Sequence, residues 1–124
     1  MQSVSSPALA PAIGPYSPAM KLNGFLVTSG QMPVTADGRL VEGGIEEQTR
    51  QIFNNVRALL SVEGMDVTNV LKTTVYVQDL RDYPKLNAVY AEEFLGHKPA
   101  RTTIQVAALP MGAKVEIEFI AAVR

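Results

Sequence analysis

The chain has 124 residues, of which 47% are hydrophobic and 19% are charged. This length and balance predict one globular domain over residues 1–124 and exclude a disordered or fibrous chain. The absence of cysteine excludes disulfide bonds and thiolate metal sites and favours a cytoplasmic location. The net charge is −1 and the basic residues are scattered, which argues against nucleic acid as a partner. No apolar run approaches the roughly 20 residues of a membrane span, so we expect no membrane partner.

The chain begins with a segment that predicts a loose arm and then a β-hairpin. Residues 1–14 contain two prolines and no basic start, which is atypical of a signal peptide, so we expect a loosely held N-terminal arm. Asn23 and Gly24 lie between two short apolar runs, and this pair is preferred in two-residue hairpin turns. Residues 19–30 are therefore predicted to form a hairpin.

The middle of the chain predicts a helix followed by a strand. Within residues 43–64, acidic residues stand at the start, Gly64 stands at the end, and six residues recur at helical spacing. These are Ile45, Thr49, Ile52, Val56, Leu59 and Leu60. Residues 69–79 are rich in β-branched side chains and alternate, which predicts a strand.

A second helix and two further strands are predicted in the last third of the chain. Asp82 and Pro84 mark the start of a helix that ends near Gly96. The segments "PARTTIQV" and "KVEIEFIAAV" alternate with a period of two and predict strands. The resulting order is ββαβαββ, an α+β fold in which two helices cover one face of a sheet.

The other face of this predicted sheet carries polar side chains. Strand alternation gives three groups for that face: Lys72, Thr74 and Tyr76; Arg101, Thr103 and Gln105; and Glu116, Glu118 and Ile120. We therefore expect Arg101 and Glu116 to point to the same face. Such a face either meets water or is shared between subunits around a polar cavity.

Few residues are available for chemistry. No common nucleotide, metalloprotease or serine-hydrolase motif is present, and His97 is the single histidine. A dedicated transition-metal site is not expected. Arg101 and Glu116 are open to two interpretations. They form a cross-strand ion pair, or Arg101 holds a ligand carboxylate while Glu116 orients or deprotonates water.

An ordered set of segments resembles the Rid family of reactive-intermediate imine deaminases, in particular its RidA branch. The segments are "AIGPYS", "LVTSGQMPV", "QTRQIFNNVRALL", "VLKTTVYVQDL", "NAVYAEEF", "KPARTTIQVAALP" and "VEIEFIAAV". Their order and spacing match from Ala12 to the end of the chain. The resemblance implies a chorismate-mutase-like subunit in a homotrimeric barrel, with active sites between subunits.

The resemblance also implies roles for seven residues. Arg101 would bind the substrate carboxylate and Glu116 would act on water, while the others would bind the substrate. This second group comprises Tyr16, Ser29, Gly30, Asn87 and Thr103. Many relatives have cysteine at position 103, but the family role there is assigned mainly to the backbone carbonyl.

The activity implied by the resemblance is cofactor-independent hydrolysis of 2-iminobutanoate and 2-iminopropanoate to 2-keto acids and ammonia. Two alternatives remain open at this point. The first is a regulatory protein that binds a small carboxylate without turnover. The second is a ribonuclease or translation inhibitor, which the scattered charge opposes.

Overall fold

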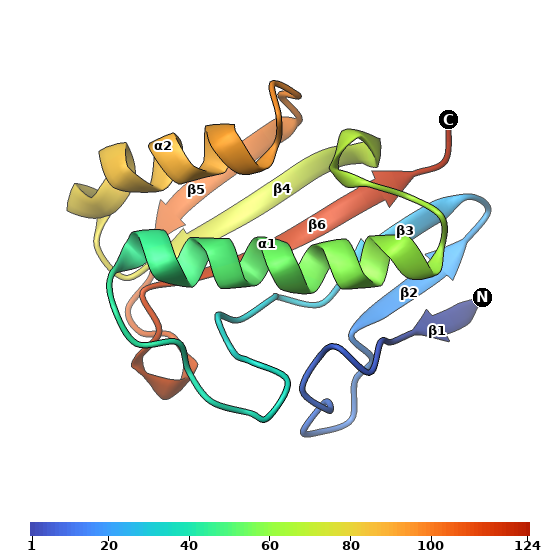
Figure 1. Cartoon of the computed structure of the whole chain (residues 1–124), viewed down its shortest axis with the longest axis horizontal. Coiled ribbons are helices and arrows are strands. Elements are labelled where there is room, and N and C mark those ends of the chain that lie inside the picture. Colours follow the sequence, from blue (N-terminus) through green and yellow to red (C-terminus); the bar gives the residue numbers. More distant parts are fainter.

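The computed structural model describes residues 1–124 and contains a single six-stranded sheet. The strands lie in the order β1-β2-β3-β6-β4-β5, and only β5 is parallel to its neighbour, β4. The strands are β1 (Gln2–Val4), β2 (Ala19–Leu22), β3 (Phe25–Thr28), β4 (Val70–Val77), β5 (Ala100–Gln105) and β6 (Val115–Ala122). Figure 1 shows β1 at one edge and β5 at the other.

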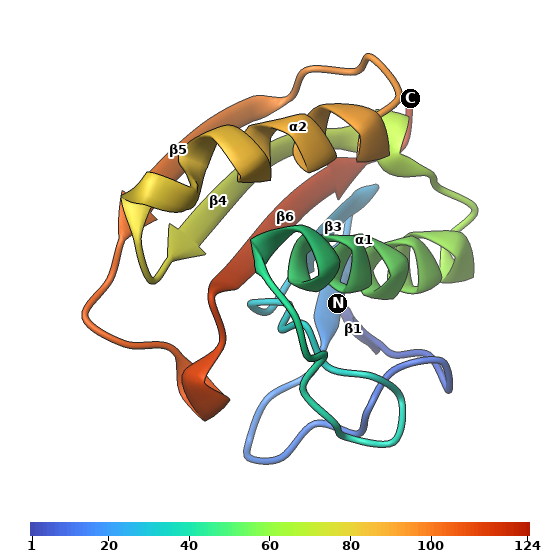
Figure 2. The ribbon, with the colours of Figure 1, turned by 60° about the vertical axis from the view of Figure 1, so that its left-hand side comes forward.

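Two helices, α1 (Ile45–Val62) and α2 (Tyr83–Glu93), cover one face of the sheet, as predicted (Figures 1 and 2). The start of α1 is stabilised by the Glu47 carboxylate, which accepts a hydrogen bond of 2.8 Å from the Gly44 backbone N–H. In α2, Pro84 occupies the first turn, where its missing N–H has no intrahelical partner to lose. Neither helix is long and apolar enough to cross a membrane.

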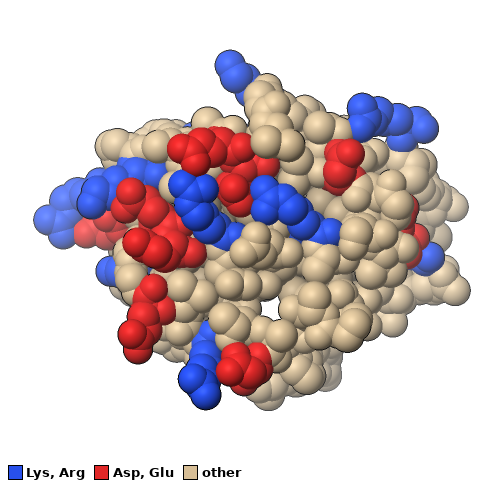
Figure 3. All heavy atoms as spheres, viewed as in Figure 1, with Lys and Arg blue, Asp and Glu red and all other residues tan.

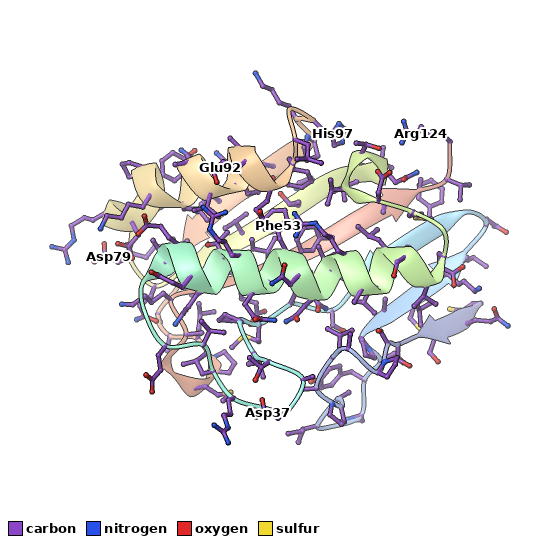
Figure 4. All side chains as sticks on the ribbon, viewed as in Figure 1. Asp37, Phe53, Asp79, Glu92, His97 and Arg124 are labelled. Carbon is purple, nitrogen blue, oxygen red and sulfur yellow. The ribbon has the colours of Figure 1, made fainter.

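The core lies between the helices and the sheet. It is a cluster of 21 buried residues. They come from every strand except β5, from both helices and from the turns that follow the helices. Phe53 stands at its centre, between α1 and α2 (Figure 4), and contacts Tyr90, Phe94 and Phe119 edge to face at 5.1–5.8 Å. This packing places α2 directly against β4 and β5.

Two local features differ from the sequence predictions. Residues 2–4, which fall within the predicted loose arm of residues 1–14, form β1 and pair with β2. Strand alternation places Leu71 on the side opposite to Lys72, Thr74 and Tyr76, which predicts that it faces the helices. In the structure it is 50% exposed, because a register shift between Val70 and Lys72 turns it outward. Val70 is buried in its place.

The orientation predicted for β5 is wrong. Arg101 pairs with Thr73 and Thr103 pairs with Val75, two buried residues of β4 that face the helices. Paired residues in a parallel ladder point to the same face, so Arg101 and Thr103 lie on the helix side. Glu116 pairs with Tyr76 and lies on the open face as predicted. Arg101 and Glu116 are therefore on opposite faces of the sheet.

The open face is polar over β4 and the first half of β6, where Glu116 and Glu118 lie, and apolar over β2, β3 and the end of β6. In its apolar part, Met20 pairs with Val27 and Val27 pairs with Ile120, and all three side chains are exposed. Leu22 and Phe25 form a second exposed pair. A contiguous apolar area of this kind is typical of an interaction surface.

Candidate functional site

Arg101 is held by a row of polar and aromatic residues on α2. Tyr83, Asn87 and Tyr90 are spaced by four and three residues, so they share one side of the helix. The Arg101 guanidinium lies against this side. Its Nη1 donates to Asn87 Oδ1 at 2.8 Å and its Nη2 donates to the Tyr83 hydroxyl at 2.6 Å. The guanidinium plane is therefore fixed by two hydrogen bonds.

Aromatic rings also surround this guanidinium. Its central carbon lies 4.8 Å from the centroid of the Tyr90 ring and 5.3 Å from that of Tyr83, distances at which a cation is attracted to the ring. No carboxylate of the chain lies within ion-pair distance of Arg101, although seven such pairs occur elsewhere. The predicted cross-strand ion pair with Glu116 does not form. The positive charge of Arg101 is left without an anion.

A cavity of about 460 Å³ opens beside this guanidinium and is lined by Leu80, Tyr83, Arg101 and Thr103. We call it the Arg101 cavity. The Thr103 hydroxyl oxygen is buried and has no hydrogen-bond partner. Because Val106 N–H donates to Val77 of β4, strand alternation turns the Thr103 carbonyl outward, to the free edge of β5. The Arg101 cavity thus offers donors and a free carbonyl oxygen.

Glu116 lies where β3 and β6 separate. Val27 of β3 pairs with Ile120 of β6, and the next pair is Gln31 with Ile117. Three residues separate these pairs on the β3 side and two on the β6 side, so the β3 side has one extra residue. This β-bulge carries Ser29 and Gly30 over the Glu116 side chain. Its C-terminal end is held by two backbone hydrogen bonds between Gln31 and Ile117, at 2.7 and 3.1 Å.

The backbone at Gly30 approaches the Glu116 side chain so closely that any larger residue at position 30 would displace the carboxylate. A Cβ atom on Gly30 would stand 2.1 Å from Glu116 Oε2 and 2.7 Å from its carboxyl carbon. Ser29 is fixed by its hydroxyl, which donates to the Ser17 carbonyl at 2.6 Å. This bond connects the bulge to the segment that carries Tyr16. The bulge beside Glu116 is therefore tied to the N-terminal loop by this hydrogen bond.

These residues line a second cavity of about 600 Å³, which we call the Glu116 cavity. Its polar wall is formed by Glu116, Ser29 and Gly30, and its apolar wall by Leu9, Ile13 and Met111. Tyr16 lies between them and is half-exposed. In Figure 1 the loops that form this cavity gather below α1, whereas α2 and β5 lie above it.

Glu116 and Tyr76, two groups on the open face, have raised pKa values. Burial raises the pKa of Glu116, and the nearby Glu118 carboxylate raises it further. No donor of the chain forms a hydrogen bond with the Glu116 carboxylate. Glu118, in contrast, accepts a hydrogen bond of 2.5 Å from Tyr76. This bond, followed by burial and the charges of Glu118 and Glu116, raises the pKa of Tyr76 to about 12. Glu116 is the carboxylate with free acceptor sites and a pKa shifted toward neutrality.

The structure thus divides the seven predicted site residues into two groups. Arg101, Asn87 and Thr103 lie together at the Arg101 cavity, and Tyr16, Ser29, Gly30 and Glu116 lie together at the Glu116 cavity. The two cavities share no lining residue. Their central residues are on opposite faces of the sheet and pair with positions three residues apart on β4. One copy of the chain does not bring the two groups together.

Tyr83 lines the Arg101 cavity but is not among the residues predicted from the sequence. Its position four residues before Asn87 is the signal that points to it, because residues at this spacing share a helix side. His97, in contrast, lies away from both cavities, where its Nε2 is 2.7 Å from the Val70 carbonyl oxygen. No cluster of three His, Asp or Glu side chains capable of holding a metal ion occurs in the chain.

Residues 7–123 match the family model described as Endoribonuclease L-PSP. The chain belongs to this family. The human 2-iminobutanoate/2-iminopropanoate deaminase is 42% identical over 123 residues, covering 98% of this chain and 90% of the human protein. A RutC family protein of Pyrococcus horikoshii is 46% identical over 110 residues, covering 88% and 87%.

Solved structures of the family share the fold of the chain. The crystal structure of Escherichia coli TdcF with bound serine has a TM-score of 0.94 and 34% identity, with full coverage of both chains. That of the E. coli YjgF gene product has a TM-score of 0.94 and 38% identity, again with full coverage. The Rid-family resemblance and the chorismate-mutase-like fold are therefore confirmed.

Proposed function

We propose that this Rid-family protein hydrolyses small 2-imino acids, such as 2-iminobutanoate and 2-iminopropanoate, to 2-keto acids and ammonia. The observation that carries the proposal is the Arg101 guanidinium, which is fixed by Asn87 and Tyr83 yet has no anion in the chain. A planar guanidinium with free N–H groups binds a carboxylate bidentately. The names of the human and Arabidopsis thaliana relatives, both deaminases of reactive intermediates or imines, support this reading.

Binding through Arg101 would orient the substrate for attack. The carboxylate lies in the guanidinium fork, and the Thr103 carbonyl oxygen at the edge of β5 accepts a hydrogen bond from the imine nitrogen. A protonated imine carbon is already electrophilic, so the reaction needs water and proton transfer but no electron acceptor or cofactor. Fixing the carboxylate converts a random encounter into an oriented one.

Glu116 is the group suited to the water. It takes a proton as the water oxygen bonds to the imine carbon, which gives a tetrahedral carbinolamine. It then returns the proton to the nitrogen. As the C–N bond breaks, Glu116 accepts the hydroxyl proton of the carbinolamine, so that the keto group forms and ammonia leaves; this last proton goes to the released ammonia or to water. The raised pKa of Glu116 favours these transfers near neutral pH, because a general acid–base works best close to its own pKa.

This mechanism requires two copies of the chain at each site. Arg101 and Glu116 lie on opposite faces of one subunit, so we propose a homotrimer in which the Arg101 cavity of one subunit meets the Glu116 cavity of the next. A cyclic assembly repeats one such contact three times. The exposed apolar side chains of β2, β3 and β6 support this arrangement, because assembly would remove them from water.

Ribonuclease activity, which the family description names, has less support in this chain. Backbone phosphates are bound by clustered basic residues. On the helix side of the molecule, Lys and Arg are interleaved with Asp and Glu (Figure 3). All six arginines of the chain take part in ion pairs or lie at the proposed site: Arg39, Arg50, Arg57, Arg81, Arg101 and Arg124.

The test is an assay in which a threonine dehydratase generates 2-iminobutanoate and semicarbazide traps the imine that is not hydrolysed. The wild-type protein should speed the formation of 2-oxobutanoate and ammonia. Arg101→Ala should lower kcat/KM by at least about 10²-fold, since a charge-assisted contact is lost. Turnover that is unchanged in Arg101→Ala would refute this role. Saturable binding of 2-oxobutanoate without any turnover would instead favour the regulatory binding protein.

Arg124→Ala is a matched control for the loss of an arginine. Arg124 is exposed at the C-terminal end of the chain (Figure 4). It contacts Thr68 and Asp66. It lies in neither cavity. This variant should retain wild-type turnover and wild-type mass in solution.

A further inference from the structure

The Tyr83 hydroxyl group accepts a hydrogen bond but donates none within the chain. Its oxygen accepts the 2.6 Å hydrogen bond from Arg101 Nη2, and the ring stacks with the guanidinium at 5.3 Å. No group of the chain accepts the hydroxyl hydrogen of Tyr83. The residue is 37% exposed and lines the Arg101 cavity. The hydroxyl hydrogen is therefore free to be donated to a molecule in that cavity.

The donors of Arg101 can be counted in the same way. A guanidinium has five N–H groups, and one is used by Asn87 and one by Tyr83. The remaining three are enough for a bidentate carboxylate. Because Tyr83 already contacts Nη2, its hydroxyl lies next to the oxygen that such a carboxylate would place on that nitrogen. A carboxylate offers about four acceptor positions, so two remain after the bidentate contact.

We propose that Tyr83 is a substrate-binding residue that donates its hydroxyl hydrogen to the carboxylate held by Arg101. This inference rests on the proposed function and extends it, because it gives the carboxylate a third donor. The hydrogen bond that Tyr83 accepts from a cation polarises its O–H group and strengthens the donation. A phenylalanine would supply the same ring to Arg101 but not this hydrogen.

The character of the cavity supports a ligand with several acceptors. Besides Tyr83, the buried Thr103 hydroxyl in the same cavity has no partner within the chain. An unpaired buried hydroxyl is costly and is normally satisfied by a ligand or by ordered water. Of the four lining residues, only Leu80 has a side chain with no polar atom. The cavity is thus suited to a small anion and poorly suited to an apolar group.

The experiment compares Tyr83→Phe with the wild-type protein by two readouts. Calorimetry measures the Kd of 2-oxobutanoate, the product of the proposed reaction, and the coupled dehydratase assay measures kcat and KM. We expect Kd and KM to rise about ten-fold and kcat to change by less than about three-fold, since one charge-assisted hydrogen bond to the carboxylate is removed. The substitution removes a half-exposed oxygen and no core contact, so we expect the fold to be retained.

Thr102→Val is the matched control. It also removes one hydroxyl, from the residue next to Arg101, but Thr102 pairs with Thr74 and faces the other side of the sheet. Its hydroxyl accepts a 3.2 Å hydrogen bond from Lys72. Kd and KM should stay at wild-type values in this variant.

The outcomes separate this inference from the function on which it rests. A wild-type protein that binds 2-oxobutanoate and hydrolyses the imine, with Tyr83→Phe unchanged in Kd and KM, would overturn the role of Tyr83 and leave the proposed function standing. A ten-fold loss in both Tyr83→Phe and Thr102→Val would also overturn it, because the effect would not depend on the cavity. A wild-type protein with neither binding nor turnover would overturn the proposed function and this inference with it.

Discussion

The Arg101 cavity and the Glu116 cavity differ in charge, in support and in hydrogen bonding. Arg101 is held by two hydrogen bonds and two aromatic rings from α2, so its position is set before any ligand arrives. Glu116 has no hydrogen-bond donor from the chain, and burial disfavours its charged form. The first arrangement suits a group that binds and orients, and the second suits a group that exchanges protons with water. The Arg101 cavity thus has a fixed cation and no carboxylate, and the Glu116 cavity has a carboxylate and no cation.

Glu116→Gln tests whether Glu116 exchanges protons and does not bind the substrate. Among the variants of the Glu116 cavity, it should have the largest effect on kcat. The glutamine keeps the shape of the side chain but cannot take a proton, so kcat should fall about 10²-fold. KM should change by less than about three-fold, because the carboxylate of the substrate is held at the other cavity. Steady-state kinetics in the coupled dehydratase assay measures both. If KM rises and kcat is kept, Glu116 acts in binding and the division between the cavities is wrong.

Gly30→Ala tests the support of Glu116 and should have a smaller effect. The added Cβ would overlap the Glu116 carboxylate, so the carboxylate must move. We expect kcat to fall about ten-fold, since a general base out of position transfers protons poorly. Gly44→Ala is the matched control, because its Cβ would make only an ordinary contact of 3.5 Å with Glu47. Equal kinetics in both variants would mean that the close approach at Gly30 has no part in turnover.

The smallest expected effect is on thermal stability and depends on pH. The pKa of Glu116 is raised above its ordinary value of 4.5 in the folded protein, so the ionised carboxylate disfavours the fold at neutral pH. Glu116→Gln should therefore raise Tm by about 1–2 °C at pH 8. The gain should disappear as the pH falls through the raised pKa to below 4.5, where Glu116 is protonated in both states.

Thermal melts of Glu116→Gln at several pH values measure this effect. Glu42→Gln serves as the control, because Glu42 is exposed and makes no ion pair. A Tm gain that is the same at pH 4 and at pH 8 would contradict the burial of an unpartnered charge at Glu116.

The two cavities also differ in how far the sequence predicts them. The face on which Glu116 lies follows from a local signal, the strict alternation of β6, whose apolar residues show which face is buried. The sequence predicts Ser29 and Gly30 as the end of the hairpin, and only the family resemblance gives them a role at a site. In β5, both sets of alternating residues contain polar side chains, so the pattern does not say which set faces the helices. Pairing with β4 decides it, and a shift of one residue reverses every side chain.

The helices show the same contrast between local and tertiary information. The apolar spacing and end signals of α1 predict its bounds closely, because that helix buries a continuous apolar side. The side of α2 that holds Arg101 is made of Tyr83, Asn87 and Tyr90, which at the sequence level look like surface or core residues. Their role depends on a residue of β5 brought beside them by folding.

The most direct test of the central claim, that each site is shared by two subunits, is to mix Arg101→Ala and Glu116→Gln subunits that are each almost inactive. In a cyclic trimer formed at random from equal amounts, about one site in four joins an intact Arg101 from one subunit to an intact Glu116 from the next. The account therefore predicts recovery of about a quarter of wild-type turnover after co-refolding. Turnover that stays at the level of the separate variants, in trimers shown to be mixed, would contradict it.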